Sequence, residues 1–230
     1  MFKLYLDPGH GGADSGATAN GLQEKNITLD IALRIRDLLE KDYEDVNIRM
    51  SRTTDTTRSL SQRTNDANSW GADYFLSIHV NAFNGSAQGY EDYIHTSLTD
   101  SSLTAQYRNI MHDEITKVNN LSNRGKKKAN FHVLRETAMS ALLTENGFID
   151  NTSDAEKLRS SSWRQAVAQG HVNGLAGAFN LTRKQTTTPN DLYRVIVDGT
   201  QEGAYRDEQN ILNAVSRNLQ TAERIVIEKV

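Results

Sequence analysis

The 230-residue sequence contains no cysteine. It can therefore form no disulfide bond and no thiolate metal site, and any metal must be held by histidine and carboxylate side chains. The absence of cysteine also suits a protein that works outside a reducing cytosol, although it does not require one.

The sequence also lacks an excess of positive charge and a long apolar run. Its net charge is -3 and its pI is about 6.1, which gives no signature of polyanion binding, so we expect no nucleic-acid partner. No stretch is long and apolar enough to cross a membrane, and we expect no membrane partner. The N-terminus already reads as a core strand, without the basic and apolar regions of a signal peptide.

What the sequence does contain is an alternation of short apolar strands and amphipathic helices over its first 180 residues. Strand, helix, strand, helix and strand follow one another at 2–6, 27–41, 46–50, 59–70 and 75–80. This order predicts an α/β fold with a mixed, largely parallel sheet flanked by helices. Further strands are expected at 89–95, 131–135 and 141–148, and further helices at 103–118, from 151 and at 163–179.

The C-terminal part is expected to be a separate, small module. Residues 183–189 are polar and end in proline, which is typical of a linker. We predict a first domain at 1–181, a linker at 182–190 and a β-α-β module at 191–230. About forty residues are few for a lone core, and an unpaired sheet edge would favour dimerisation or docking on the first domain.

Two histidines and two glutamates stand at positions where strands end or a helix begins. His10 follows the apolar run of the first strand after an Asp-Pro-Gly turn, and His79 and Glu145 lie in two later apolar strands, while Glu24 opens the first helix. Ligands collect at the carboxyl ends of parallel strands, and these side chains are the donor types of a catalytic zinc site. Taken singly, each also has an ordinary structural role: a hydrogen-bonded loop histidine, or a glutamate that complements a helix dipole.

Together these stretches resemble the type-3 family of zinc-dependent N-acetylmuramoyl-L-alanine amidases. These enzymes cut the bond between muramic acid and the first residue of the peptidoglycan stem peptide. The matching segments keep the family's order up to about residue 180: Leu6–Gly12, Glu24, Ser77–Ala82 and Thr144–Ile149. Where many members carry a proline before the last of these strands, this sequence has Met139-Ser140-Ala141.

The resemblance implies a function and a set of site residues. His10, Glu24 and His79 would hold one Zn²⁺, Glu145 would be the catalytic carboxylate, and bacterial peptidoglycan would be the substrate. A zinc peptidase that cuts within the stem peptide, or a wall-binding protein without activity, remain alternatives. A serine hydrolase is less favoured, since no Gly-x-Ser-x-Gly motif is present.

Four residues are candidates for substrate binding. Asn81 could orient His79 or the substrate, or cap a turn. Glu91 falls where the family often places a residue near the zinc. Arg124 and Lys126 belong to a basic run at 123–128 that suits peptide carboxylates but equally suits a solvated loop.

Other polar residues are expected to be structural. Arg52, Arg58 and Arg63 match arginines of the family, and pairing with carboxylates that fix a loop is favoured over substrate contact. His95 and His132 are expected to belong to the fold, and His112 has no partner evident from the sequence.

The sequence also suggests a role for the C-terminal module and a route by which the protein reaches the cell wall. The module loosely resembles half of a SPOR-type peptidoglycan-binding module, and it would bind the wall or assemble the enzyme as a homo-oligomer. We expect synthesis in the cytoplasm and action on the wall after holin-type release or cell lysis. That is the behaviour of a phage endolysin or an autolysin.

Overall fold

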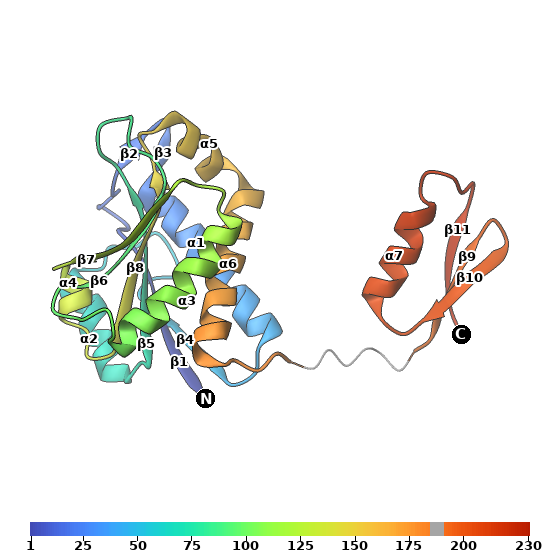
Figure 1. Ribbon diagram of the computed structural model, residues 1–230, viewed down its shortest axis with the longest axis horizontal. Helices are drawn as coiled ribbons and strands as arrows, with labels where there is room; N and C mark the ends of the chain where they lie inside the picture. Colours follow the sequence, from blue (N-terminus) through green and yellow to red (C-terminus); the bar gives the residue numbers. More distant parts are fainter. Residues whose placement is uncertain (185–190) are drawn as a thin grey trace. The chain divides into compact units, whose positions relative to one another are not determined.

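The computed structural model describes residues 1–184 and 191–230, which divide into two compact units, Met1–Lys184 and Gln185–Val230. The first unit is built on a six-stranded sheet (Figure 1). Across the sheet the strands are β4 (Val46–Met50), β1 (Phe2–Pro8), β5 (Tyr74–Asn81), β8 (Ser140–Phe148), β6 (Tyr90–His95) and β7 (Asn123–Ala129). The first four run parallel, β6 is antiparallel to β8, and β7 is parallel to β6. The predicted mixed, largely parallel sheet is confirmed.

Helices cover both faces of this sheet. One face packs against α1 (Glu24–Asp42), α3 (Leu103–Val118) and α6 (Ser161–Phe179), and the other against α2 (Leu60–Trp70) and α4 (His132–Arg135). Side chains of β1 alternate between the two cores, Leu4 and Leu6 towards α1 and Tyr5 towards α2, as the period of a strand requires. The short strands β2 (Thr18–Ala19) and β3 (Leu22–Gln23) precede α1, and α5 (Thr152–Arg159) packs on β8 and α6.

Local sequence signals explain where several helices begin and end. α2 starts at Ser59, which forms a capping box with Gln62, and ends at Gly71 in the left-handed conformation with φ 67°. At α5 the cap is the residue directly before Thr152, the first helical position. Asn151 is the cap, and its side chain accepts hydrogen bonds from the N–H groups of Ser153 and Asp154.

Two segments have a different structure from the one predicted. Residues 131–135 were expected to form a strand, but His132–Arg135 is the helical turn α4, with the adjacent residues Val133 and Leu134 both buried. Two neighbouring buried residues suit a helical turn and not the alternation of a strand. The basic run at 123–128, for which no strand was predicted, is the edge strand β7. Exposed lysines on an edge strand discourage pairing with another chain.

The first unit continues into the start of the predicted linker. The N–H of Glu44 donates to the carbonyl of Thr182, and the N–H of Lys184 donates to the carbonyl of Asp42. The remaining residues of the predicted linker, 185–190, lie outside the described residues.

The second unit has one strand more than the predicted β-α-β arrangement. Its antiparallel sheet has the order β10-β9-β11, formed by β9 (Tyr193–Val197), β10 (Thr200–Tyr205) and β11 (Ile225–Lys229), and α7 (Glu208–Asn218) packs on β9 and β10. Asp198 and Gly199, both with positive φ, form the tight turn between β9 and β10. An Asp-Gly pair is a recognised hairpin signal, but β10 is polar and mostly exposed and so lacks the apolar alternation of a strand. In the described ranges of both units, no helix is long and apolar enough to cross a lipid bilayer.

Candidate active site

The loop after β1 brings His10 to the carboxyl edge of the sheet. His10 has a positive φ of 62°, and the chain leaves β1 through Gly9. A Cβ atom on Gly9 would lie 2.4 Å from Cε1 of His79, so only glycine lets the imidazole of His79 approach the loop this closely. Gly16 has the same role beside Glu24 and His10. The glycines around the histidine make room for the site itself.

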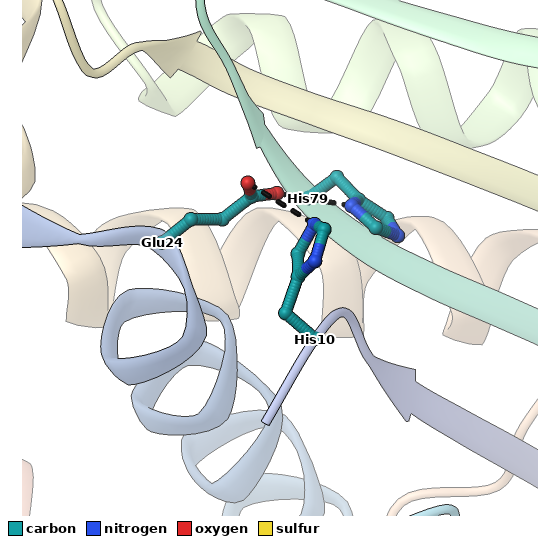
Figure 2. A group of neighbouring side chains, drawn as sticks. All are labelled: His10, Glu24 and His79. Atoms are coloured by element: carbon teal, nitrogen blue, oxygen red, sulfur yellow. Dashed lines mark hydrogen bonds and ion pairs between the residues drawn. The ribbon is translucent and has the colours of Figure 1, made fainter. Parts of the chain in front are cut away.

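His10, Glu24 and His79 come together at this edge (Figure 2). Nε2 of His10 lies 3.1 Å from Oε2 of Glu24, and Nδ1 of His79 lies 3.0 Å from Oε1 of the same carboxylate. One ligand atom from each residue lies within 4.8 Å of the other two. His10 comes from the loop after β1, Glu24 is the first residue of α1, and His79 lies on β5. β1 and β5 are parallel neighbours, so their carboxyl ends meet here.

Glu24 is buried as an ionised carboxylate. Its oxygens accept hydrogen bonds of 2.9 Å from the N–H groups of Ala17 and Val80. Burial would raise the pKa of Glu24, but the contacts with His10 and His79 outweigh burial and lower it. On the far side of the His10 ring, Nδ1 lies 2.8 Å from Oδ2 of Asp14. A carboxylate behind a histidine is the usual outer partner of a metal ligand, because it orients the ring and leaves Nε2 free to bind.

This donor set suits a zinc ion. Imidazole nitrogens and a carboxylate oxygen are common zinc ligands, and one such atom from each residue lies within 4.8 Å of the other two. The shorter distances of 3.1 and 3.0 Å join the two histidines to different oxygens of Glu24. Two imidazoles and one carboxylate leave one position of the tetrahedron for water or substrate. Among the described residues, His10, Glu24 and His79 form the one group of three or more histidine and acidic residues whose ligand atoms lie close enough together to hold a metal ion.

Glu145 lies next to this group on β8. It is the register partner of His79 on one side and of Glu91 on the other. Its Oε2 is buried and has no hydrogen-bond partner among the described residues. Burial raises the pKa of Glu145 well above its ordinary value, and the charges of Glu24 and Glu91 raise it further. A carboxyl group whose pKa is raised in this way is suited both to accepting and to releasing a proton.

Two cavities flank the histidine pair, and His10, His79 and Leu60 line both of them. The Glu145 cavity, of about 290 Å³, has mostly apolar walls and is completed by Phe131, His132, Val133, Leu143 and Glu145. The Arg58 cavity, of about 360 Å³, is completed by Asp7, Gly9, Asp14, Thr57, Arg58, Ser59 and Arg63. The walls of both cavities are mostly apolar, and the Arg58 cavity differs in that Arg58 and Arg63 line it.

Three of the four predicted substrate residues, Asn81, Glu91 and Arg124, lie together at the start of β6. Glu91 is 2% exposed; it accepts hydrogen bonds from Asn81 (2.9 Å) and Tyr93 (2.6 Å) and forms ion pairs with Arg124 (2.6 Å) and Lys127. Burial raises the pKa of Glu91, but the bonds from Lys127, Tyr93 and Arg124 outweigh burial and lower it. Lys126 pairs instead with Asp113 at 3.3 Å. Substrate contact by these residues stays a prediction.

Arg52 and Arg58, in the loop after β4, and Arg63, on α2, differ in their partners. Arg63 forms a buried ion pair with Asp7 at 2.6 Å, as expected. Arg52 donates to backbone carbonyls, including those of Pro8 and Gly9, and not to a carboxylate. The side chain of Arg58 makes no hydrogen bond or ion pair that the structure records among the described residues.

The structure also assigns partners that the sequence did not reveal. His112 lies 2.7 Å from Asp92 and 3.1 Å from Asn123, inside the fold. His132, expected to be structural, lines the Glu145 cavity, and its Nε2 is buried without a partner among the described residues. The apolar neighbours of His132 suggested a strand, which concealed this position.

A histidine–carboxylate–histidine group beside a second, unpaired carboxyl is typical of mononuclear metallohydrolases. The comparison with known families agrees. Residues 4–177 match the model of the N-acetylmuramoyl-L-alanine amidase family, and the chain belongs to this family. It is accordingly a peptidoglycan amidase, and the predicted family is confirmed.

Relatives and solved structures support this placement. The chain is 57% identical over 210 residues to the N-acetylmuramoyl-L-alanine amidase CwlM of Bacillus licheniformis, covering 91% of this chain and 78% of the relative. It is 43% identical over 188 residues to the endolysin of Bacillus phage SPP1, covering 80% and 69%. The catalytic domain of the amidase CwlV from Bacillus (Paenibacillus) polymyxa var. colistinus superposes with a TM-score of 0.75 at 31% identity, covering 79% of this chain and all of that domain.

Proposed function

We propose that this amidase is zinc-dependent, with His10, Glu24 and His79 as the metal ligands and Glu145 as the residue that moves protons. The reaction is hydrolysis of the amide between N-acetylmuramic acid and the L-alanine of the stem peptide. The observation that carries the proposal is the buried carboxylate of Glu24 placed between two imidazoles, with the unpaired carboxyl of Glu145 in the adjoining cavity.

Bound zinc supplies two effects: it lowers the pKa of water from 15.7 towards about 7, and it polarises the amide carbonyl. The chain prepares the site for the ion. Asp14 holds the His10 ring through Nδ1, and the N–H groups of Ala17 and Val80 hold the carboxylate of Glu24. Little reorganisation is then needed on binding.

Glu145 is suited to both proton transfers of the reaction. As an ionised carboxylate it takes a proton from the attacking water while the new carbon–oxygen bond forms. It then gives that proton to the alanine nitrogen, which must be protonated to leave as the carbon–nitrogen bond breaks. The raised pKa of Glu145, caused mainly by burial, favours the return of the proton. One carboxyl group acting first as base and then as acid is sufficient.

Two variants separate metal binding from proton transfer. Glu145→Gln should retain about one zinc per chain and lose hydrolysis, whereas His79→Ala should lose both. Zinc content is measured on the purified protein, and products released from purified peptidoglycan are identified by mass analysis. Stem peptides with a free N-terminal alanine identify the amidase reaction, and new amino termini within the stem would identify a peptidase instead. High activity in Glu145→Gln would refute the assigned role.

For Asn81, Glu91 and Arg124 the contacts support a positioning role. Their network of hydrogen bonds and ion pairs holds the start of β6 against β8, next to Glu145. Since Glu91 is already saturated with donors, it is more suited to holding Asn81 and Arg124 at the rim than to binding substrate itself.

For the second unit we propose binding to the cell wall. It is a compact unit of its own, and a truncation after Lys184 should still cleave soluble muropeptides but sediment less with purified walls. An unchanged sedimentation of the truncated protein would favour the alternative role in assembly. We further propose that the protein reaches the wall when a cell lyses, in line with the name of its endolysin relative.

A further inference from the structure

Among the described residues, Arg58 is the charged residue lining the Arg58 cavity whose side chain has no partner. Both carboxylates of the lining are held: Asp7 by Arg63 and Ser77, and Asp14 by His10 and the N–H of Gly16. No hydrogen bond or ion pair to the Arg58 side chain is recorded within residues 1–184 and 191–230. An arginine beside a reaction site with no internal partner has its donors free for a ligand.

The backbone of Arg58 is fixed relative to the metal site. The guanidinium of Arg63 donates through Nε to the carbonyl of Arg58 (3.1 Å) and through Nη2 to the carbonyl of His10 (2.7 Å). The buried side chain of Arg63 therefore holds the backbone of Arg58 next to the backbone of His10.

The neighbouring residues add two further constraints. Ser59 begins α2 with a capping box, and the hydroxyl of Thr57 accepts a hydrogen bond of 3.0 Å from the N–H of Ala13. The loop carrying Arg58 is thus joined to the loop carrying His10 at Thr57, and at Ser59 it is fixed to the start of α2. A cation on such a support loses little backbone freedom when it binds.

The two cavities differ in the charge they accept. The Glu145 cavity has apolar walls formed by Leu60, Phe131 and Leu143 and contains the carboxyl of Glu145, so it disfavours an anionic group. The Arg58 cavity, which the same histidines line, offers a guanidinium that has no partner among the described residues. An anionic part of the substrate is therefore directed to the Arg58 side.

We propose that Arg58 binds a carboxylate of the stem peptide and so sets a preference among peptidoglycan chemotypes, an inference that rests on the proposed amidase function. The carboxylate closest to the scissile amide belongs to the second stem residue, a glutamate joined through its side chain, whose α-carboxyl is free in some walls and amidated in others. It lies one residue from the scissile bond, about 3.3–3.6 Å per residue along an extended chain. The muramyl group then occupies the Glu145 cavity.

The test compares two muropeptides that differ only in whether this α-carboxyl is free or amidated. Binding is measured by calorimetry in the Glu145→Gln background, where turnover does not interfere, and kcat/KM is measured with Glu145 intact. With Arg58 present, the free-carboxyl form should bind about tenfold more tightly, the scale of one charge-assisted hydrogen bond. The preference should weaken as salt is raised.

Variants assign the preference to the side chain. Arg58→Gln should weaken binding of the free-carboxyl form about tenfold and leave the amidated form unchanged, and Arg58→Lys should keep part of the preference. Arg36→Gln, the same change on α1, which lines neither cavity, should change neither form. Equal loss for both muropeptides in Arg58→Gln, or no loss for either, would overturn the proposal. A failure of the proton-transfer mechanism would instead appear as hydrolysis by Glu145→Gln, and the preference of Arg58 would then be measured from kcat/KM for the two muropeptides with Glu145 intact.

Discussion

Glu91 and Glu145 face each other across the paired strands β6 and β8. Among the described residues, only Glu91 forms ion pairs with cationic side chains. Glu91 accepts bonds from four side chains, whereas Oε2 of Glu145 accepts none among the described residues. Their pKa values move in opposite directions for this reason, down for Glu91 and up for Glu145. The neighbouring negative charge helps to keep a proton available on Glu145.

Glu91→Gln should shift the pH dependence of hydrolysis. Removing the charge of Glu91 lowers the pKa of Glu145, and the freed cations of Arg124 and Lys127 act in the same direction. Because the ionised form of Glu145 accepts the proton, the acid limb of kcat/KM should move to lower pH while zinc content is unchanged. Tyr93→Phe, which removes one hydrogen bond to Glu91 without changing charge, is the control. An acid limb that stays in place in Glu91→Gln would contradict the coupling.

Asp14→Asn should weaken zinc binding without unfolding the protein. The change removes the negative charge behind Nδ1 of His10, and loss of such an outer partner typically costs about 10–100-fold in metal affinity. Affinity is measured by competition with a chromophoric chelator. Asp37→Asn, on the exposed face of α1, should leave affinity unchanged, and an equal affinity in both variants would rule out the role of Asp14.

Arg63→Met should destabilise the fold strongly. The change leaves the carboxylate of Asp7 buried without its cation and removes donors to the carbonyls of Pro8 and His10. Breaking a buried pair in this way costs about 3–5 kcal/mol in free energy of unfolding. Arg49→Met breaks the exposed pair with Asp66 and should cost about 1 kcal/mol or less. Denaturant unfolding of both variants measures the difference, and similar losses would show that burial of the Arg63 pair is unimportant.

His171 should make stability fall as the pH is lowered. It is buried beneath β8, donates from Nδ1 to the carbonyl of Val167 (2.8 Å) and lies 3.2 Å from the hydroxyl of Thr144 through Nε2. Burial lowers the pKa of His171 to about 4. The unfolded chain takes up this proton below about pH 6.5 and the folded chain only near pH 4, so the stabilisation present above pH 6.5 is lost across that window. The full loss is about 3 kcal/mol.

The variant His171→Gln isolates this contribution. Its free energy of unfolding, measured by denaturant at several pH values, should depend less on pH between 6.5 and 4 than that of the parent. Carboxylates with lowered pKa values, such as Asp7, contribute mainly below this window and are common to both proteins. Parallel pH curves for the two proteins would refute the assignment.

Much of the fold could be predicted because its signals are local. The alternation of β1, the helical period of α1 and the Ser59 and Gly71 ends of α2 are each contained in a short stretch of sequence. The errors fell where local signals were weak. At α4, apolar and polar residues mixed over five positions fit a strand and a helical turn equally, and packing against α2 decided between them. β7 and β10 are polar edge strands without apolar alternation, and β7 pairs with β6, which α3 separates from it in the sequence.

The sequence alone determined the fold class and, through ordered motifs at strand ends, the set of His10, Glu24, His79 and Glu145. Only the tertiary structure decided how the charges around them are used. Arg52, Arg58 and Arg63 look alike in the sequence, yet Arg63 is paired with a carboxylate, Arg52 is bound to backbone carbonyls and the side chain of Arg58 has no partner among the described residues. The same holds for Glu91 and Glu145. The physical reason is that the state of a charge depends on which distant groups the strand register and the packing bring within a few ångströms of it.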